Sequence, residues 1–217
     1  MRRDFFVEQL AVPGLTEKTD KVWTLPEYVD WLYEKLGGDS APILIGHSNG
    51  GRIALAFAAK YPGRLKTLIL IDSAGIRRNE LPIRLKRFVF GLAAKIGKKL
   101  TRCETFRNLL YRLARESDYK NASPLMRETM ANVISVDLTD QISKIKTPTL
   151  IIWGDNDRMT PLSDGKLMHK LIQTSTLHII TGTGHSPHFT HAPEVAKKIA
   201  EICNASLITK LISKAPL

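Results

Sequence analysis

The chain has 217 residues, 43% hydrophobic and 24% charged, a composition that predicts one sizeable globular domain, with or without a large insertion, and excludes a disordered chain. No apolar run reaches the roughly 18 residues of a membrane span, and no long apolar stretch follows Arg2 and Arg3, so neither a transmembrane helix nor a secretory signal is predicted. Much of the formal net charge of +11 lies between Arg77 and Arg115, interleaved with apolar residues at helical spacing, which favours the solvated face of amphipathic helices over a nucleic-acid site.

Buried strands and helices alternate along the first 75 residues. Continuous apolar runs of four to eight residues are typical of central parallel strands, and Pro-Gly or Gly-Gly pairs end the intervening segments. The predicted elements, in order, are a strand at 5–12, a helix at 25–36, a strand at 42–45, a helix at 50–61 and a strand at 65–72. This alternation predicts an α/β fold, with a mostly parallel sheet covered by helices on both faces.

The alternation stops between residues 76 and 145, where Leu, Arg and Lys recur at helical spacing without a strand pattern. We expect this segment to be a helical cap or lid insertion, and residues 1–75 and 146–217 to form the core. The alternation then resumes with a strand at 149–153, a helix at 164–172, a strand at 176–180 and a helix at 193–203.

The pentapeptide Gly46-His47-Ser48-Asn49-Gly50 matches the pattern G-x-S-x-G. It follows a predicted strand and opens a predicted helix, which is the setting of a nucleophile elbow. Such a sharp turn strains the serine backbone, and we expect glycine at 46 and 50 because the chain passes too closely for side chains there. A glycine-rich turn with an incidental serine is the alternative.

A serine hydroxyl needs a base, and imidazole suits this role because its ordinary pKa is near 6.5. Of six histidines, His185 lies in a loop just after the strand at 176–180, at the same carboxyl edge of the sheet as Ser48. We expect His47 to point away from the site. His169, His178, His188 and His191 are expected to be surface or packing residues, although His188 and His191 lie close enough to line a pocket.

The base in turn needs a carboxylate to fix its tautomer. The loop after the strand at 149–153 offers Asp155 and Asp157. Asp157 lies deeper in the loop and is our choice, although spacing alone does not decide between them, and Asp155 is expected to shape the turn. Asp72, at the end of the preceding strand, is a third candidate. The chain order Ser, Asp, His is the one known for this kind of site.

Four motifs, in the right order, resemble those of the α/β-hydrolase family, in particular its capped esterases, lactonases and carbon–carbon-bond hydrolases. They are Val12-Pro13-Gly14-Leu15, Gly46-His47-Ser48-Asn49-Gly50-Gly51, Gly154-Asp155-Asn156-Asp157 with Thr160-Pro161, and Gly184-His185-Ser186-Pro187. The resemblance implies a triad of Ser48, Asp157 and His185, with the N–H of Asn49 as an oxyanion donor. The helical stretch at 76–145 matches the position of the family's cap.

The sequence departs from the family at its front. The family begins with further strands, one of which ends in a His-Gly loop that supplies a second oxyanion donor, whereas here no His-Gly pair precedes the elbow. The chain therefore resembles the last three-quarters of the fold, with the N-terminal strands missing. Such a sheet would have an exposed edge, which offers a surface for homo-oligomerisation.

These features together predict a cytoplasmic serine hydrolase that cleaves esters or lactones of small molecules through an acyl-enzyme on Ser48. Cys103 and Cys203 lie far apart and are expected to be reduced thiols. No metal or organic cofactor is implied. The alternatives are a carbon–carbon-bond hydrolase with the same triad, a catalytically weak remnant that acts as a binding module, and, on charge alone, a nucleic-acid-binding protein.

Overall fold

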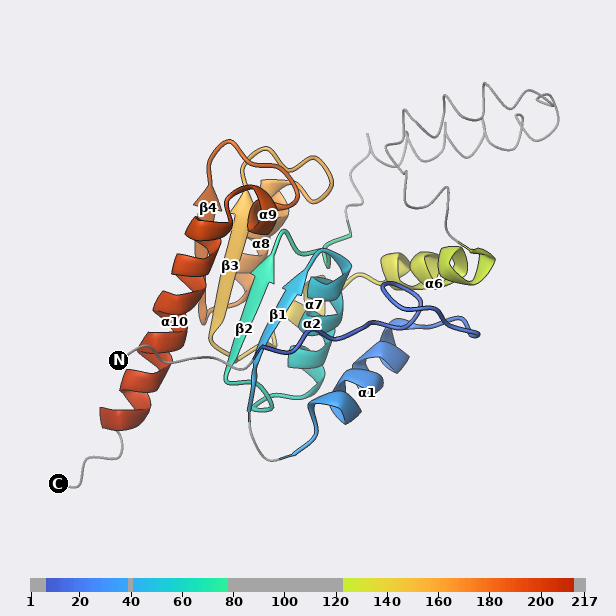
Figure 1. Ribbon diagram of the computed structural model, residues 1–217, viewed down its shortest axis with the longest axis horizontal. Coiled ribbons are helices and arrows are strands. Elements are labelled where there is room, and N and C mark those ends of the chain that lie inside the picture. The colour runs from blue at the N-terminus through green and yellow to red at the C-terminus, as the bar shows by residue number, and fades with distance from the viewer. Residues whose placement is uncertain (1–6, 39–40, 78–122, 213–217) are drawn as a thin grey trace. The chain divides into compact units, whose positions relative to one another are not determined.

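The computed structural model describes residues 7–38, 41–77 and 123–212, with side chains as far as Cys203 (Figure 1). The chain divides into two compact units, one of residues 1–24 and 78–135 and the other of residues 25–77 and 136–217. Most of the predicted helical insertion, including the basic stretch that follows Arg77, lies outside the described residues, as does Cys103.

The larger unit contains a four-stranded sheet in which every neighbouring pair is parallel, as the sequence predicts (Figure 1). The strands lie in the order β1 (Ile43–His47), β2 (Thr67–Ile71), β3 (Thr149–Gly154) and β4 (Ser175–Ile180). Both central strands, β2 and β3, are buried along their whole length, which explains their unbroken apolar runs.

The strand register brings the carboxyl ends to a common edge. His47 pairs with Ile71, and Gly154 pairs with Ile180, so the loops that leave β1, β2, β3 and β4 start side by side. Open parallel sheets build their sites at this edge. The register therefore decides which loops can share a site.

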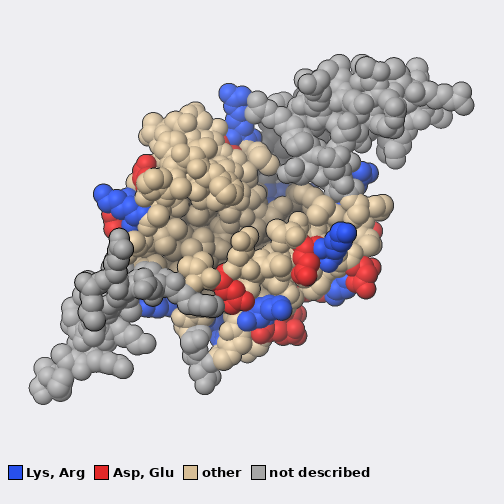
Figure 2. All heavy atoms as spheres, in the orientation of Figure 1, with Lys and Arg blue, Asp and Glu red and all other residues tan. Residues whose placement is uncertain are grey.

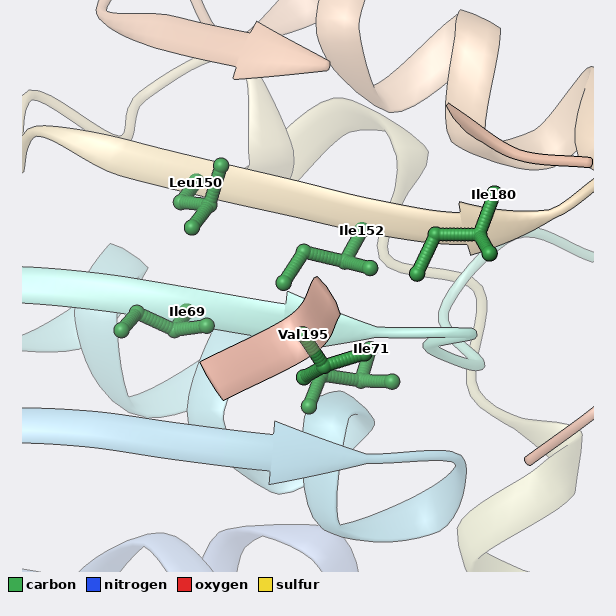
Figure 3. Packing of buried hydrophobic residues seen from close by; sticks show 6 residues of the cluster. All are labelled: Ile69, Ile71, Leu150, Ile152, Ile180 and Val195. Carbon is green, nitrogen blue, oxygen red and sulfur yellow. The ribbon is translucent and has the colours of Figure 1, made fainter. Parts of the chain in front are cut away.

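Helices cover both faces of this sheet (Figure 1). One face packs against α10 (Ala192–Ile212), whose Val195 joins a buried aliphatic cluster with residues of β2, β3 and β4 (Figure 3). Ile69, Ile71, Leu150, Ile152 and Ile180 complete the cluster. Burying one such side chain stabilises a fold by about 1.5–3 kcal/mol, so this layer is a major part of the core.

The opposite face packs against α2 (Asn49–Lys60) and α8 (Leu162–Leu171). Trp153 is fully buried there, and Gly165 of α8 comes so close that an added Cβ would lie 2.6 Å from the indole ring. On the outer side of α2, α1 (Leu25–Leu36) is held by a hydrogen bond from the Tyr61 hydroxyl to Asp30.

The smaller unit contains the described residues 7–24 and α6 (Pro124–Ser135). The predicted strand at 5–12 is wrong over its described part, because residues 7–12 form no strand. The carbonyl of Val12 accepts hydrogen bonds from the N–H groups of three residues that follow, so this backbone closes a tight turn instead. Within the unit, the Trp23 N–H donates to the Thr129 hydroxyl of α6, 3.0 Å away.

The two stems of the predicted insertion meet within the larger unit. The Arg77 N–H donates to the Asp137 carboxylate, and the Leu138 N–H donates to the carbonyl of Gly75. The buried guanidinium of Arg52, in α2, donates to the carbonyl of Val136. Residues 136–145, with the short α7 (Thr139–Ile142), therefore pack with the sheet, although the sequence analysis assigned them to the insertion.

Charged side chains of the described residues form mixed groups of both signs on the face in Figure 2. The surface over the carboxyl ends of β3 and β4 is mainly uncharged in this view (Figure 2). Among residues 7–38, 41–77 and 123–212, no helix combines the length and apolar character that a membrane span requires.

Candidate active site

Ser48 occupies the turn between β1 and α2 with φ 52° and ψ −119°. Within the described residues, only Ser48 and Asp72 are non-glycine residues with positive φ. Three backbone hydrogen bonds hold the strained serine, because its N–H donates to Ile71 and its carbonyl accepts from Arg52 and Ala74. Strain that the surroundings impose in this way is typical of functional sites.

Close backbone packing makes this turn possible. A Cβ on Gly46 would lie 2.7 Å from the Cα of Gly51, and a Cβ on Gly51 would lie 2.2 Å from the Ser73 hydroxyl oxygen. A Cβ on Gly50 would meet no atom within 4 Å. The expectation that 46 and 50 are the crowded positions is thus correct for Gly46 and wrong for Gly50, whose place is taken by Gly51.

The structure brings Ser48, His185 and Asp157 together in one hydrogen-bonded chain. His185 Nδ1 lies 2.8 Å from Asp157 Oδ2, and His185 Nε2 lies 3.0 Å from Ser48 Oγ. A carboxylate only accepts, so Nδ1 carries the proton and Nε2 presents its lone pair to the serine hydroxyl. This is the tautomer in which an imidazole can take the serine proton.

Asp157 is held as a carboxylate. Its side chain is fully buried, and burial by itself would raise its pKa. Hydrogen bonds from His185, the Thr160 hydroxyl and the Met159 N–H outweigh that effect, so the pKa is lowered from its ordinary value. The group facing His185 Nδ1 is therefore negatively charged at neutral pH.

Thr160 is a site residue that sequence reasoning did not single out. Its hydroxyl lies 2.6 Å from Asp157 Oδ2, 3.1 Å from the carbonyl of Asp72 and 3.2 Å from His185 Nδ1. It therefore ties the acid loop to the ends of two strands. The Thr-Pro pair three residues after the aspartate was the available signal.

His47 does not point away from the site, as the sequence analysis expected. Its Nε2 lies 2.7 Å from the carbonyl oxygen of His185, and its ring centroid is 4.9 Å from that of His185. Burial lowers the pKa of His47 to about 4, so the ring is neutral and Nε2–H donates to the carbonyl. The residue next to Ser48 thus anchors the loop that carries the base.

The remaining candidates have supporting positions. Asp155 accepts a 2.8 Å hydrogen bond from the Gly182 N–H, which joins the acid loop to the histidine loop, in keeping with its expected role in shaping the turn. His188 contacts His47 with ring centroids 4.4 Å apart and the rings tilted by 55°. His191 directly follows the short α9 (Pro187–Thr190), and its Nδ1 lies 3.0 Å from the Thr190 hydroxyl.

Asp72 is buried among these groups. Its Oδ1 accepts from the Gly154 N–H at 2.9 Å, while Oδ2 has no hydrogen-bond partner. Burial, followed by the negative charge of Asp157, raises the pKa of Asp72 to about 7. One nitrogen each from His47 and His185 and one oxygen of Asp72 lie within 4.8 Å of one another. Because both nitrogens of His185 are already hydrogen-bonded, the arrangement favours proton transfer over metal binding.

Asn49 is the first residue of α2. Its N–H therefore has no acceptor within the helix, and the helix dipole makes this end attractive to negative charge. A backbone donor beside Ser48 Oγ is the kind of group that stabilises an oxyanion.

Comparison with known proteins identifies the fold family of the chain. A family model described as "alpha/beta hydrolase fold" matches residues 15–192. A 2-hydroxy-6-oxo-6-phenylhexa-2,4-dienoate hydrolase from Comamonas testosteroni is 29% identical over an alignment of 182 positions, which covers 76% of this chain and 63% of the relative. Lipase 1 from Psychrobacter immobilis is 28% identical over an alignment of 179 positions, which covers 70% of this chain and 52% of the lipase.

Among solved structures, an esterase from Thermogutta terrifontis matches with a TM-score of 0.61 and 24% identity, covering 91% of this chain and 78% of the esterase. At that identity the match shows a shared fold. The chain spans 63% of the length of the Comamonas testosteroni hydrolase and 52% of the length of the lipase.

The elbow predicts opposite effects for two neighbouring glycines. Gly46→Ala places a methyl group 2.7–2.8 Å from backbone atoms of residues 50 and 51, so we expect a loss of about 1–3 kcal/mol in the free energy of unfolding. Gly50→Ala meets open space inside a helix and should be neutral or stabilise by up to about 1 kcal/mol. Urea denaturation measures both, and equal losses would contradict the described packing.

The raised pKa of Asp72 predicts a pH-dependent stability. An aspartate in the unfolded chain titrates near 3.9, and the folded one titrates at about 7, so between these values the folded state binds more protons. The free energy of unfolding therefore falls as pH rises, by up to about 1.4 kcal/mol per unit. Relative to wild type, Asp72→Asn should gain stability from about pH 4 to about pH 7 and level off above. A constant difference in urea denaturation would contradict this.

Proposed function

The chain belongs to the α/β-hydrolase fold family, and we propose that it is a serine hydrolase that cleaves ester or lactone bonds of small molecules. The observation that carries the proposal is the continuous hydrogen-bonded chain from Ser48 through His185 to Asp157, at 3.0 and 2.8 Å. A strained serine, a base with the correct tautomer and a charged acid are the three parts that acyl transfer requires.

In the proposed mechanism, Ser48 Oγ attacks the substrate carbonyl carbon as its proton passes to His185 Nε2. The imidazolium that forms is stabilised by Asp157, and the carbonyl oxygen becomes an oxyanion that the Asn49 N–H can stabilise. His185 then gives the proton to the leaving alcohol, and the acyl group stays on Ser48. A water molecule, deprotonated by His185, releases the acid and restores the hydroxyl.

His47 has a positioning role in this proposal. It is held neutral by burial and bonds to the backbone of His185, so it fixes the loop without competing for the catalytic proton. Thr160 does the same for Asp157. Orientation of this kind contributes to catalysis because misplacement by about 1 Å can cost two orders of magnitude in rate.

The test is turnover of short-chain p-nitrophenyl esters by the chain and by Ser48→Ala. We expect the substitution to lower kcat by about 10⁴-fold or more, because the nucleophile is removed while the fold is kept. Ser143→Ala, at the exposed end of α7, is a matched control that should keep the wild-type rate. A fluorophosphonate probe should label wild type at Ser48, as located by peptide mass spectrometry. Equal rates in wild type and Ser48→Ala would instead support a remnant that acts as a binding module.

A second candidate reaction, hydrolysis of a carbon–carbon bond, is favoured by the 29% identical relative named for a 2-hydroxy-6-oxo-6-phenylhexa-2,4-dienoate substrate. That dienoate can be offered to the chain directly, and loss of its absorbance followed against time. A kcat/KM higher than for p-nitrophenyl esters, abolished by Ser48→Ala, would assign this reaction to the same site. No loss of absorbance beside rapid ester turnover would leave ester hydrolysis as the activity.

A further inference from the structure

Asp72 is a buried carboxyl group that the proposed mechanism does not use. It has no solvent-exposed surface, it lies in the second of the two strained backbone positions at φ 40°, and Oδ2 has no hydrogen-bond partner. An unsatisfied buried carboxyl oxygen costs free energy, because its lost hydration is not replaced. Its position within 4.8 Å of ring nitrogens of His47 and His185 suggests a cause in the chemistry of the site.

Three titratable groups face Asp72 from the elements around it. His47 ends β1, Asp157 lies in the loop after β3, and His185 lies in the loop after β4. Atoms of Asp72, His47 and His185 lie within 4.8 Å of one another. A movement of roughly 2 Å would bring a carboxyl oxygen of Asp72 to hydrogen-bond distance from an imidazole nitrogen. Asp72 thus approaches the base from the sheet, whereas Asp157 approaches it from the loop.

We propose that Asp72 is a reserve acid of the catalytic site, a positioning residue that can hold His185 by its Nδ1–H when Asp157 does not. This inference rests on the proposed function and adds a residue to it. In the intact site, Asp157 occupies Nδ1, and the two buried carboxyl groups do not both ionise at low cost.

The charges of Asp72 and Asp157 explain why Asp72 does not hold His185 in the intact site. With Asp157 ionised, Asp72 keeps its proton up to about neutral pH. Removing the carboxylate of Asp157 takes away the like charge and leaves Nδ1–H with only the uncharged Thr160 hydroxyl, 3.2 Å away. Asp72 then releases its proton to solvent, and its carboxylate becomes the acceptor for Nδ1–H.

The experiment compares Asp157→Ala, Asp72→Asn and the double variant with wild type and Ser48→Ala, using p-nitrophenyl ester turnover. Alanine is chosen at 157 because an amide would hold the wrong imidazole tautomer. We expect Asp157→Ala to lower kcat by about 10²–10⁴-fold and to retain at least about tenfold more activity than the double variant. Asp72→Asn should cost much more in the Asp157→Ala background than in wild type.

Two further readouts separate a reserve acid from a merely structural residue. The pH profile of the residual rate should differ between Asp157→Ala and the double variant, because only the former keeps a carboxyl group that can ionise beside His185. The downfield proton NMR signal of a hydrogen-bonded imidazole Nδ1–H should persist in Asp157→Ala and vanish in the double variant. The NMR signal needs no turnover, so it tests Asp72 whatever substrate the protein prefers. Asp157→Ser replaces the alanine variant if that protein fails to fold.

The outcomes are distinguishable. Equal residual rates, equal pH profiles and equal NMR spectra for Asp157→Ala and the double variant would overturn the reserve-acid proposal while leaving Ser48 as nucleophile. Wild-type turnover by Ser48→Ala would overturn the proposed function. In that case, an Nδ1–H NMR signal that persists in Asp157→Ala and is lost in the double variant would still show that Asp72 holds His185.

Discussion

The candidate site depends on how closely two pieces of backbone approach where β1 turns into α2. A Cβ on the residue before His47 would clash with the backbone of α2, and a Cβ on the third residue of α2 would clash with Ser73. This close packing holds Ser48 at φ 52°. The strain raises the hydroxyl above the carboxyl edge of the sheet, within 3.0 Å of His185. The loops after β4 and β3 then bring the base His185 and the acid Asp157 to this hydroxyl.

Parallel register accomplishes this. Because four neighbouring strands end in step, four consecutive loops leave the sheet side by side, and each contributes a titratable group. In this crowded site the pKa of Asp157 is lowered, whereas the pKa of Asp72 is raised. Asp157 receives enough hydrogen bonds to stay ionised, while Asp72 receives one and keeps its proton to about neutral pH, and burial keeps His47 neutral. One carboxylate and neutral imidazoles are the charge state in which a serine proton can be taken.

Much of this could be predicted from sequence, because the responsible signals are local. Apolar runs predicted all four strands, and G-x-S-x-G, the acid loop and the histidine loop identified three residues that the structure joins. The failures involve contacts across the sheet. Nothing near His47 in sequence reveals that its ring meets the carbonyl of His185, 138 residues away. The crowding at Gly51 comes from Ser73, in the loop after β2. The strand predicted up to Val12 is wrong because the apolar residues there are not buried in a sheet, and Val7 is 81% exposed.

The stems that meet at Arg77 and Asp137 have a consequence for how such a chain can change over evolutionary time. Since the backbone leaves the sheet unit and returns to it at one hydrogen-bonded point, the segment between can lengthen, shorten or be exchanged with little added cost in loop-closure entropy. The sheet unit, with Ser48, Asp157 and His185, then stays constant while the segment between the two stems varies. A lineage built on this sheet could acquire new specificities by exchanging the segment between Arg77 and Asp137, while the residues of the candidate site are inherited unaltered.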